Sequence, residues 1–559
     1  MFMTFNPINE IEEKLLAALT AAGERVLSAE GIEAKKLPEI EVEIPREDEH
    51  GDYASNLALA LGGKLDRNPR QLAEKIAENL EAEIIENVKV AGPGFINFWL
   101  DDSWLYETVD KILALKEEYG QTDFGQNKRV QIEFVSVNPT GPLHVGHSRG
   151  AVVGDTLASI MQEAGFEVER EYLINDAGNQ MDLLGKSTFL RYQELFGREV
   201  DMPENSYKGE YVIDIAQDLK AEYGDSLLGK SGAEAEEIAR EFAYEKILKI
   251  IKEDLHEFGI EFDNWFSERT LHQEGRIEKA VEKLRDKGYI YEEDEAVWFA
   301  SSEFGDDKDR VVIKSNGSPT YMGADIAYHL DKINRGFDKL INVWGADHHG
   351  YIDRMKASVE ALGYERDLLE IIIVQIVNLM SGDEKLPMSK REGEFVTMRE
   401  LMEEVGLDAA RYFFIMRSTD SHFDFDLDLA KKESKDNPVY YIQYAHARIC
   451  SIKDNTEELA ADLETADLGL LEDEAEKELL QYLAYYPEEI KQAARQRAPH
   501  RLANYIYDLA NAFHVFYNKC QVLTEDRQLS LARLKLVEAA RIVLVNVLNI
   551  IGVSAPEQM

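Results

Sequence analysis

Apolar positions recur with different periods along the chain, and the changes of period mark its regions. The first 122 residues combine a helical pattern from Glu10, the strand-like stretch EIEVEIP, the helical stretch RNPRQLAEKIAENL and the segment VKVAGPGFINFWL. This mixture predicts a small α+β domain over residues 1–122. A polar break at residues 124–127 then separates this domain from the next one.

The pattern after residue 123 is typical of a parallel sheet with helices between its strands. RVQIEFVSVN alternates like a strand, HVGHSRGAVVGDTLASIMQEAG has helical spacing before a glycine cap, and EVEREYLIND is a second strand. Strand, helix and strand in succession predict a doubly wound, Rossmann-like domain over residues 123–380. Residues of about 180 to 275 indicate a mostly helical insertion, after which INVWGADHH and EIIIVQIV resume the strand character.

Long helical patterns fill the last part of the chain. Segments such as RLANYIYDLANAFHVFYNKC and LARLKLVEAARIVLVNVLNII predict an all-helical bundle over residues 431–559, and residues 381–430 form the connection to it. The expected fold class is therefore multidomain α/β. It combines a doubly wound parallel sheet with an N-terminal α+β module and a C-terminal all-α bundle.

Composition narrows the class of protein. The two cysteines, Cys450 and Cys520, provide neither a disulfide framework nor a multi-thiolate zinc site, which suits a reducing, cytoplasmic compartment. The apolar runs are too short to span a bilayer and the N-terminus has no basic segment leading into an apolar one, so we expect no membrane attachment. The net charge of -45 argues against a nucleic-acid partner, but 62 Lys and Arg remain and local potential decides such contacts. We interpret the acidity as a solubility trait.

The candidate chemistry begins where the first strand of the sheet turns into its helix. Gly141 and Pro142 shape the turn, and His144 and His147 come next at a spacing that places both at the helix start on one face. Backbone N–H groups and imidazole donors at such a position suit a triphosphate. The alternative is a pair of histidines that caps the helix and binds nothing.

A second element lies in the segment from Lys385 to Gly393, which reads KLPMSKREG. A loop with a lysine, a hydroxyl and an arginine can close over a departing pyrophosphate. Alone, it would more often be a solvated basic loop. An HxGH at the first strand-to-helix turn combined with an MSK loop after the last core strand resembles the class I aminoacyl-tRNA synthetases, and the arginyl-tRNA synthetase family in particular.

Several stretches show the resemblance to the arginyl family over nearly the full length. EFVSVNPTGPLHVGHSRGAVVGD is similar to its signature, YLINDAGNQ to the segment after the signature, and TYMGADIAYHLDK with VWGADHHGYIDRM to its arginine pocket. LDAARYFFIMRS and NPVYYIQYAHARI resemble its stem-contact region and the opening of its anticodon-binding domain. HGDYASNLAL and GPGFINFWL resemble the N-terminal module that contacts the tRNA elbow.

The resemblance implies substrates, partners and site residues. The substrates would be L-arginine, ATP with Mg²⁺ and tRNA(Arg), with arginyl-adenylate as intermediate, transfer to the 2′-hydroxyl of the terminal adenosine, and tRNA required before activation; we expect a monomer. Residues that would bind ATP are Gly141, Leu143, His144, Gly146, His147, Met388, Ser389 and Lys390, of which His144, His147, Ser389 and Lys390 would be catalytic. Residues that would bind arginine are Glu133, Ser136, Asn138, Tyr321, Asp325 and Asp347. Residues that would contact tRNA are Phe95, Asn97, Tyr440, Tyr444 and His446.

The chain departs from the family's pattern at two positions. Pro387 stands where the family's loop commonly has its first lysine, with Lys385 two residues earlier, so the role at pyrophosphate falls on Lys390. Asp347 stands where some relatives have glutamine in the arginine pocket.

The chemistry of a guanidinium supports the pocket assignment independently. A planar, permanently charged fork needs carboxylates that accept paired hydrogen bonds, and Glu133 and Asp325 are acids within apolar patterns. The alternative for Glu133 is a solvated strand face, and an isolated Tyr321 would more often be core. Next to Asp347, His348 and His349 on a strand would point to opposite faces, so we expect no metal site there.

Two other classes of protein fit part of the sequence. A small-molecule nucleotidyltransferase would use HxGH but needs neither the helical C-terminal third nor the N-terminal module. A synthetase-like paralogue could hold tRNA without catalysis, which the intact His144, His147, Ser389 and Lys390 disfavour.

Overall fold

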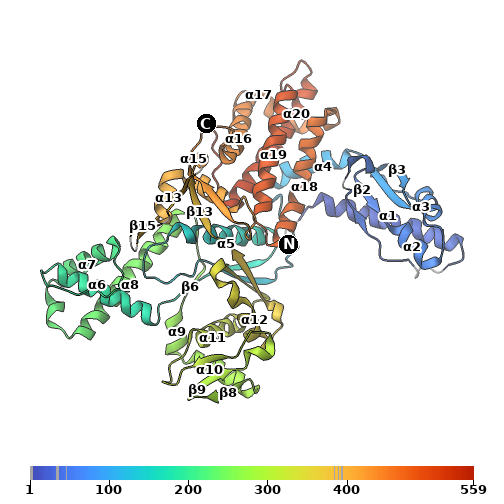
Figure 1. The fold of residues 1–559 in the computed structure, drawn as a ribbon. Helices are drawn as coiled ribbons and strands as arrows, with labels where there is room; N and C mark the ends of the chain where they lie inside the picture. Colours follow the sequence, from blue (N-terminus) through green and yellow to red (C-terminus); the bar gives the residue numbers. More distant parts are fainter. Residues whose placement is uncertain (1–3, 33–36, 46, 383, 388, 392–393) are drawn as a thin grey trace.

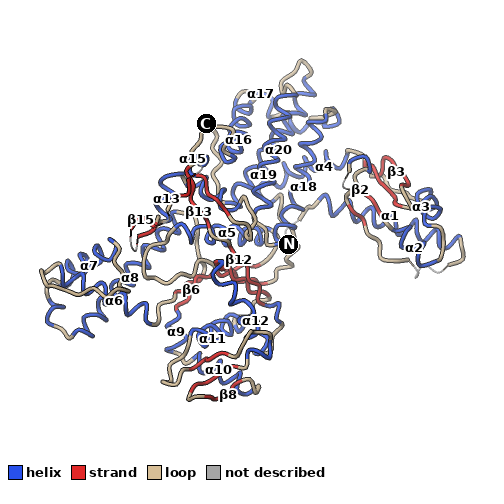
Figure 2. Tube along the Cα trace, viewed as in Figure 1, coloured by secondary structure: helices blue, strands red, loops and turns tan. Residues whose placement is uncertain are grey.

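A five-stranded parallel sheet lies at the centre of the molecule (Figures 1 and 2). The computed structural model describes residues 4–32, 37–45, 47–382, 384–387, 389–391 and 394–559. The strands follow the order β12-β11-β5-β6-β7, and all neighbours run parallel. Their bounds are β5 (Arg129–Glu133), β6 (Glu167–Ile174), β7 (Asn264–Ser267), β11 (Lys339–Gly345) and β12 (Leu369–Val374). The doubly wound sheet predicted from the sequence is confirmed.

Helices cover both faces of this sheet, because the side chains on both faces are either apolar or bound to other buried side chains. Val130 and Ile132 of β5 pack in the main core with α5 (Val145–Glu163), which comes after the first strand as predicted. α11 (Tyr321–Asn334) and α12 (Ile352–Ala361) belong to a second core with Leu340 of β11. The carboxyl ends of the strands therefore open between these layers, where parallel sheets place their ligands.

Two insertions extend from the sheet (Figure 1). The first consists of α6 (Asn179–Glu194), α7 (Glu210–Tyr223) and α8 (Gly232–Glu257). β7 then returns to the sheet at residues 264–267, so the range of about 180 to 275 expected to be insertion includes a strand of the sheet. The second insertion contains α9 (Glu268–Gln273), α10 (Arg276–Asp286) and an antiparallel sheet of β8 (Ile290–Glu293), β9 (Ala296–Phe299) and β10 (Arg310–Ile313).

The N-terminal module has a core of its own and projects to one side (Figure 1). It contains α1 (Pro7–Ala29), α2 (Leu57–Leu65), α3 (Pro69–Glu78) and a sheet of β1 (Val42–Glu43), β2 (Tyr53–Ser55), β4 (Phe95–Leu100) and β3 (Ile85–Ala91), in that order. α4 (Ser103–Leu115) packs on two helices of the C-terminal bundle, α18 (Glu474–Gln496) and α20 (Arg527–Ile551). The module's own core therefore ends near residue 100, inside the range 1–122 expected for it.

The chain crosses from the sheet to the C-terminal bundle through short elements. These are β13 (Val377–Ser381), β14 (Glu384–Leu386), β15 (Ser389–Arg391), β16 (Glu394–Phe395), α13 (Met398–Val405), α14 (Leu407–Ile415), β17 (Phe423–Asp426) and α15 (Leu427–Ala430). The bundle consists of α16 (Pro438–Asp454), α17 (Glu457–Ala460), α18, α19 (His500–Lys519) and α20. In the described part of the chain, no helix combines the length and apolar character that a membrane span requires.

Arg411 of α14 joins the sheet domain to the bundle. The side chain is 1% exposed and donates hydrogen bonds to the carbonyl oxygen of Ile551 at 2.9 Å, to that of Phe258 at 2.9 Å and to Asp155 of α5 at 2.6 Å. A Cβ at Gly552 would lie 2.3 Å from Nε of Arg411, so only glycine fits there. One guanidinium thus links the ends of α8 and α20 to α5.

Candidate active site

His144 and His147 form a reciprocal cap at the start of α5. Nδ1 of His144 accepts a hydrogen bond from the backbone N–H of Gly146 at 3.1 Å, and Nδ1 of His147 accepts one from the backbone N–H of His144 at 3.3 Å. The two rings stack with centroids 3.6 Å apart. Because each Nδ1 is an acceptor, each neutral ring carries its hydrogen on Nε2.

The surroundings of this pair favour uncharged rings. Burial lowers the pKa of His144, and burial together with the neighbouring His144 lowers the pKa of His147 to about 3. Both imidazoles are therefore neutral donors near pH 7. The capping alternative is partly correct, since both histidines cap the helix through Nδ1, while the hydrogen on each Nε2 takes no part in the cap.

The segment after the MSK loop is hydrogen-bonded to the HxGH segment. The backbone N–H of Val145 donates to the carbonyl oxygen of Val396 at 3.0 Å, and that of Met398 donates to the carbonyl oxygen of Leu143 at 2.9 Å. Thr397 caps α13, with Glu400 completing a capping box. The two motifs predicted to act on one nucleotide therefore share a backbone ladder.

The loop itself is described in part. Met388 lies outside the described residues, and for Ser389 and Lys390 the structure describes the backbone, which belongs to β15. Lys385 is exposed on β14, where it pairs with Met380 of β13.

The remaining residues predicted to bind ATP differ in exposure. Leu143 is fully buried, so its side chain belongs to the core and only its backbone can face a ligand. Gly146 is exposed at the helix start. A Cβ at Gly141 would lie 3.2 Å from the Tyr211 hydroxyl, which makes this turn closely packed.

Glu133 lies at the end of β5 and is 4% exposed. Its Oε2 accepts a hydrogen bond from Nζ of Lys332 at 2.5 Å, and Lys332 of α11 is fully buried. The alternative of a solvated strand face for Glu133 is therefore wrong. A buried carboxylate requires such a partner, because an isolated charge in an apolar interior is strongly unfavourable.

Asp325 lies in the first turns of α11 and accepts a hydrogen bond from the Tyr351 hydroxyl at 2.6 Å. Burial raises the pKa of Asp325 to about 6, the Tyr351 hydroxyl opposes this shift, and the charge of Glu133 adds to it. The charge of Glu133 thus acts on Asp325, the other carboxylate predicted for the pocket.

Glu268 is a third acid that sequence reasoning missed. It is 7% exposed, at the start of α9, and burial with the charges of Asp325 and Asp176 raises its pKa to about 7. Asp176 is 2% exposed and accepts hydrogen bonds from the Ser267 hydroxyl at 2.6 Å and the Arg269 backbone at 3.1 Å. A signal was available, since Glu268 and Asp176 come just after strands β7 and β6, where parallel sheets gather ligand-binding groups.

The backbone after β5 is strained. Val135 and Ser136 have consecutive positive φ angles of 67° and 44°, which are unusual for residues with side chains and most of all for a β-branched one. The Ser136 hydroxyl accepts a hydrogen bond from the Leu173 N–H at 3.1 Å, and its carbonyl accepts one from Asn175 at 3.1 Å. Asn138 donates to Gln180. Neighbouring strands thus hold this segment in one conformation.

Tyr321 and Asp347, the remaining residues predicted for the arginine pocket, lie at the surface. Tyr321 is 70% exposed, so it is not a core residue, and its hydroxyl would be 4.0 Å from a Cβ at Gly178. The Asp347 side chain is 78% exposed. His348 and His349 lie on a 3-10 turn, Ala346–Tyr351, and not on a strand, so the alternation argument against a shared metal does not apply to them.

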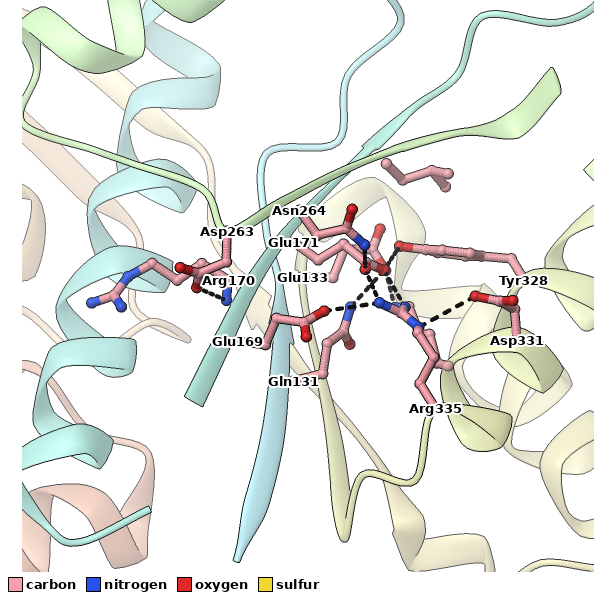
Figure 3. Close-up of polar contacts among 12 residues, drawn as sticks. Gln131, Glu133, Glu169, Arg170, Glu171, Asp263, Asn264, Tyr328, Asp331 and Arg335 are labelled. Carbon is pink, nitrogen blue, oxygen red and sulfur yellow. Dashed lines mark hydrogen bonds and ion pairs between the residues drawn. The ribbon is translucent and has the colours of Figure 1, made fainter. Parts of the chain in front are cut away.

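A second buried carboxylate, Glu171, lies beside Glu133 on β6 (Figure 3). Arg335 binds it through both terminal nitrogens, at 2.5 and 2.9 Å, and the Tyr328 hydroxyl donates at 2.6 Å. Gln131 at 2.7 Å and Asn264 at 2.5 Å complete the set. Burial raises the pKa of Glu171, but the hydrogen bonds from Arg335 and Tyr328 and the charges of Lys332 and Arg335 lower it more.

Aromatic and cationic side chains gather on the outer face of α16 and α19. Tyr440 stacks on Tyr444 with centroids 6.3 Å apart, and Tyr444 is 38% exposed. The Arg448 guanidinium lies over the rings of Tyr444 and Tyr517, at 4.6 and 4.5 Å. Since exposed aromatics beside arginine suit unpaired bases, this face is a candidate RNA surface.

Two residues predicted to contact tRNA are buried. His446 is 3% exposed and its Nδ1 lies 2.9 Å from the carbonyl oxygen of Pro556. Asn97 is 4% exposed on β4, whereas Phe95 of the same strand is half-buried. Side-chain contact with RNA by His446 or Asn97 is incompatible with this packing, because other parts of the chain cover them.

Comparisons with known proteins agree with this geometry. The family model for the class I (R) tRNA synthetase catalytic domain matches residues 108–424, which contain both motifs and the buried acids. The arginine–tRNA ligase of Bacillus subtilis (strain 168) is 50% identical over 561 residues, covering 99% of this chain and 100% of the relative. That of Carboxydothermus hydrogenoformans is 52% identical over 523 residues, covering 93% and 94%. The chain belongs to the arginine–tRNA ligase family.

Two further family models match the flanking parts of this ligase. The arginyl-tRNA synthetase N-terminal domain matches residues 9–100, and the DALR anticodon binding domain matches residues 442–559. The solved arginyl-tRNA synthetase of Thermus thermophilus has the same fold, with a TM-score of 0.73 and 24% identity over 98% of this chain and all of that one. The predicted family and fold class are confirmed.

Proposed function

We propose that this protein attaches L-arginine to tRNA(Arg) in an ATP-dependent reaction. The observation that supports it best is the pair of carboxylates, buried Glu133 and half-buried Asp325, at the carboxyl edge of a sheet whose first helix begins with His144 and His147. A cationic side chain and a nucleotide are the ligands that these two features suit.

The nucleotide side of the reaction relies on neutral donors and on the start of α5. The arginine carboxylate attacks the α-phosphate of ATP in line, and the bond to pyrophosphate breaks as the bond to the adenylate forms. Nε2–H donors of His144 and His147 and the exposed backbone at Gly146 stabilise the charge that develops. We assign Ser389 and Lys390 to the departing pyrophosphate, through the loop tied to the signature by Val145 and Val396.

The amino-acid side of the reaction relies on charge. Glu133 and Asp325 bind the guanidinium, and Tyr321 closes the pocket from its exposed position. Ser136 and Asn138, held in the strained turn after β5, bind the α-amino and carboxylate groups. Asp347 has the same access to solvent as Tyr321, which supports a role at the pocket entrance.

Mg²⁺ enters with ATP. Among the described residues, the grouping of acids and histidines close enough to hold a metal is Glu47, Glu49 and His50, which is exposed in the N-terminal module and not at the signature. An ion bound together with ATP would be held mainly by phosphate oxygens and would neutralise their charge.

The second step transfers arginine to RNA. The 2′-hydroxyl of the terminal adenosine attacks the arginyl carbonyl carbon, the ester forms, and AMP leaves. We assign the anticodon to the face of Tyr440, Tyr444 and Arg448, and an elbow contact to Phe95. We propose a cytoplasmic protein, because its two cysteines, Cys450 and Cys520, are both free thiols, and we propose that it acts as a monomer.

ATP–pyrophosphate exchange tests this function. With each of the twenty amino acids, with and without bulk tRNA, we expect exchange with arginine alone and only when tRNA is present. Exchange with another amino acid would overturn the specificity. Binding of tRNA without any exchange would identify a non-catalytic paralogue.

A further inference from the structure

A row of polar side chains crosses the sheet beneath α11. Asn342, Glu133, Glu171 and Asn264 are direct neighbours in register on β11, β5, β6 and β7. Side chains paired in this way on parallel strands lie on the same face of a sheet. Two carboxylates therefore lie side by side in a buried layer, and each needs its own counter-charge.

The two carboxylates are satisfied to different extents. Both oxygens of Glu171 are saturated by Arg335, and Tyr328, Gln131 and Asn264 donate as well (Figure 3). Among the described residues, Lys332 alone donates to Glu133, at Oε2, and no hydrogen bond reaches its Oε1. Glu171 is thus a closed structural pair, whereas Glu133 retains an acceptor.

Lys332 is itself fixed in place by neighbouring groups. Its Nζ also donates to Oδ1 of Asn342 at 3.1 Å and lies 4.3 Å from the centre of the Tyr328 ring. Nδ2 of Asn342 lies 3.0 Å from Nε2 of His329, and Nδ1 of His329 lies 2.8 Å from the carbonyl oxygen of Asp325. Since the Asp325 carbonyl can only accept, the His329 ring must donate from Nδ1 and accept at Nε2. The chain of hydrogen bonds runs from the backbone of one pocket acid to the carboxylate of the other.

We propose that Lys332 is a positioning residue for arginine selection, which holds Oε2 of Glu133 so that the ionised carboxylate presents Oε1 to the substrate guanidinium. The proposal rests on the proposed arginine-binding role of Glu133. Without Lys332, the groups that face Glu133 are Asp325 and the Tyr328 hydroxyl on α11, Glu171 on β6 and the Asn342 amide on β11. None of these supplies a positive charge, so the buried Glu133 carboxylate would have no counter-charge.

The test is a cycle of Lys332→Met, Glu133→Gln and the double variant, with KM for arginine and for ATP measured for each. Lys332→Met should raise KM for arginine about tenfold or more, because Glu133 loses the donor that holds Oε2 and balances its charge. KM for ATP should not change in parallel. A Lys332→Met enzyme whose arginine KM is unchanged or lower would overturn the proposal, since Lys332 would then only repel the guanidinium.

The double variant separates positioning from packing. If Lys332 acts through Glu133, the double variant should lose no more arginine affinity than Glu133→Gln alone. Additive losses would contradict this. Should Lys332→Met fail to fold, the double variant, which removes both buried charges, still tests the proposal through this comparison.

Two comparisons complete the design. Arg335→Met breaks the neighbouring pair with Glu171 at the end of the same helix, so it should lower thermal stability and raise KM for arginine much less than Lys332→Met does. If Glu133→Gln leaves arginine KM unchanged, the pocket assignment fails. If Glu133→Gln raises it and Lys332→Met does not, only the positioning role fails.

Discussion

The backbone N–H of Val145 lies 3.0 Å from the carbonyl oxygen of Val396, which binds the start of α5 to the segment just after the MSK loop. The loop therefore cannot shift at this end without breaking a hydrogen bond to the helix that we assign to the phosphates. This hydrogen bond makes nucleotide binding and the position of the loop depend on each other.

His147 should act on phosphate beyond its capping role. His147→Ala should lower kcat/KM about a hundredfold, because one donor to the developing charge is lost. His147→Gln is the matched variant, since glutamine at this position can keep the bond to the N-cap backbone. It should keep the melting temperature of the parent but not the activity. If His147→Gln kept the activity of the parent, His147 would act only as a helix cap.

Lys390 should matter more than Lys385, because Pro387 occupies the family's usual lysine position. Lys390→Ala should reduce kcat much more than it weakens arginine binding, which steady-state kinetics separates. Lys385, exposed on β14 and paired through its backbone, provides the control. Equal losses for the two variants would show that Lys385 has taken over the role at pyrophosphate.

Arginine affinity should fall in mild acid. Asp325, whose pKa burial raises to about 6, must be ionised to bind a guanidinium, so it becomes protonated as pH drops below 6. KM for arginine should then rise by about tenfold per pH unit, while KM for ATP stays level. Asp325→Asn should abolish the inflection near pH 6. A parent profile that is flat from about pH 5 to 8 is incompatible with this assignment.

Tyr444 should contribute to tRNA binding by stacking. Tyr444→Ala should raise KM for tRNA about tenfold, the loss expected for one base–aromatic contact. Tyr291→Ala is a suitable comparison, because that tyrosine is equally exposed, on the sheet of the second insertion, and belongs to no assigned surface. Filter binding at several salt concentrations would measure both. Equal effects of the two variants would show that this face of the bundle is not the RNA-binding surface.

Gly552 should be intolerant of any side chain. Gly552→Ala should destabilise the protein by about 3 kcal/mol, because the residue has a φ of 67° and the new Cβ would overlap Arg411. Gly288 also has a positive φ, but nothing lies within 4 Å of its Cβ position, so Gly288→Ala should cost only about 1 kcal/mol. Urea unfolding of the two variants separates the cost of the contact with Arg411 from the cost of the positive φ.

Short-range patterns in the sequence were enough to predict the central sheet. The alternation in β5, the helical spacing of α5 and its glycine cap lie within single segments, so the doubly wound sheet could be predicted. Burial of His446 and Asn97 could not be predicted, because it depends on residues elsewhere that cover them. The pairing of Glu133 with Lys332 joins a strand to a helix far away in sequence, and no local pattern distinguishes Lys332 from a solvated lysine of an amphipathic helix. Glu268 was not predicted as a site residue, because the segment that forms β7 was expected to belong to the helical insertion.

Arg411 has a consequence for how this protein can be divided. Its guanidinium satisfies carbonyl groups at the ends of two helices from different parts of the chain and a carboxylate of α5. A fragment cut before α16 would remove Ile551 and leave a buried cation open to water beside the nucleotide helix. The catalytic part therefore cannot be separated from the C-terminal bundle without a loss. A chimera with the bundle of another protein would need a hydrogen-bond acceptor for Arg411 in that bundle.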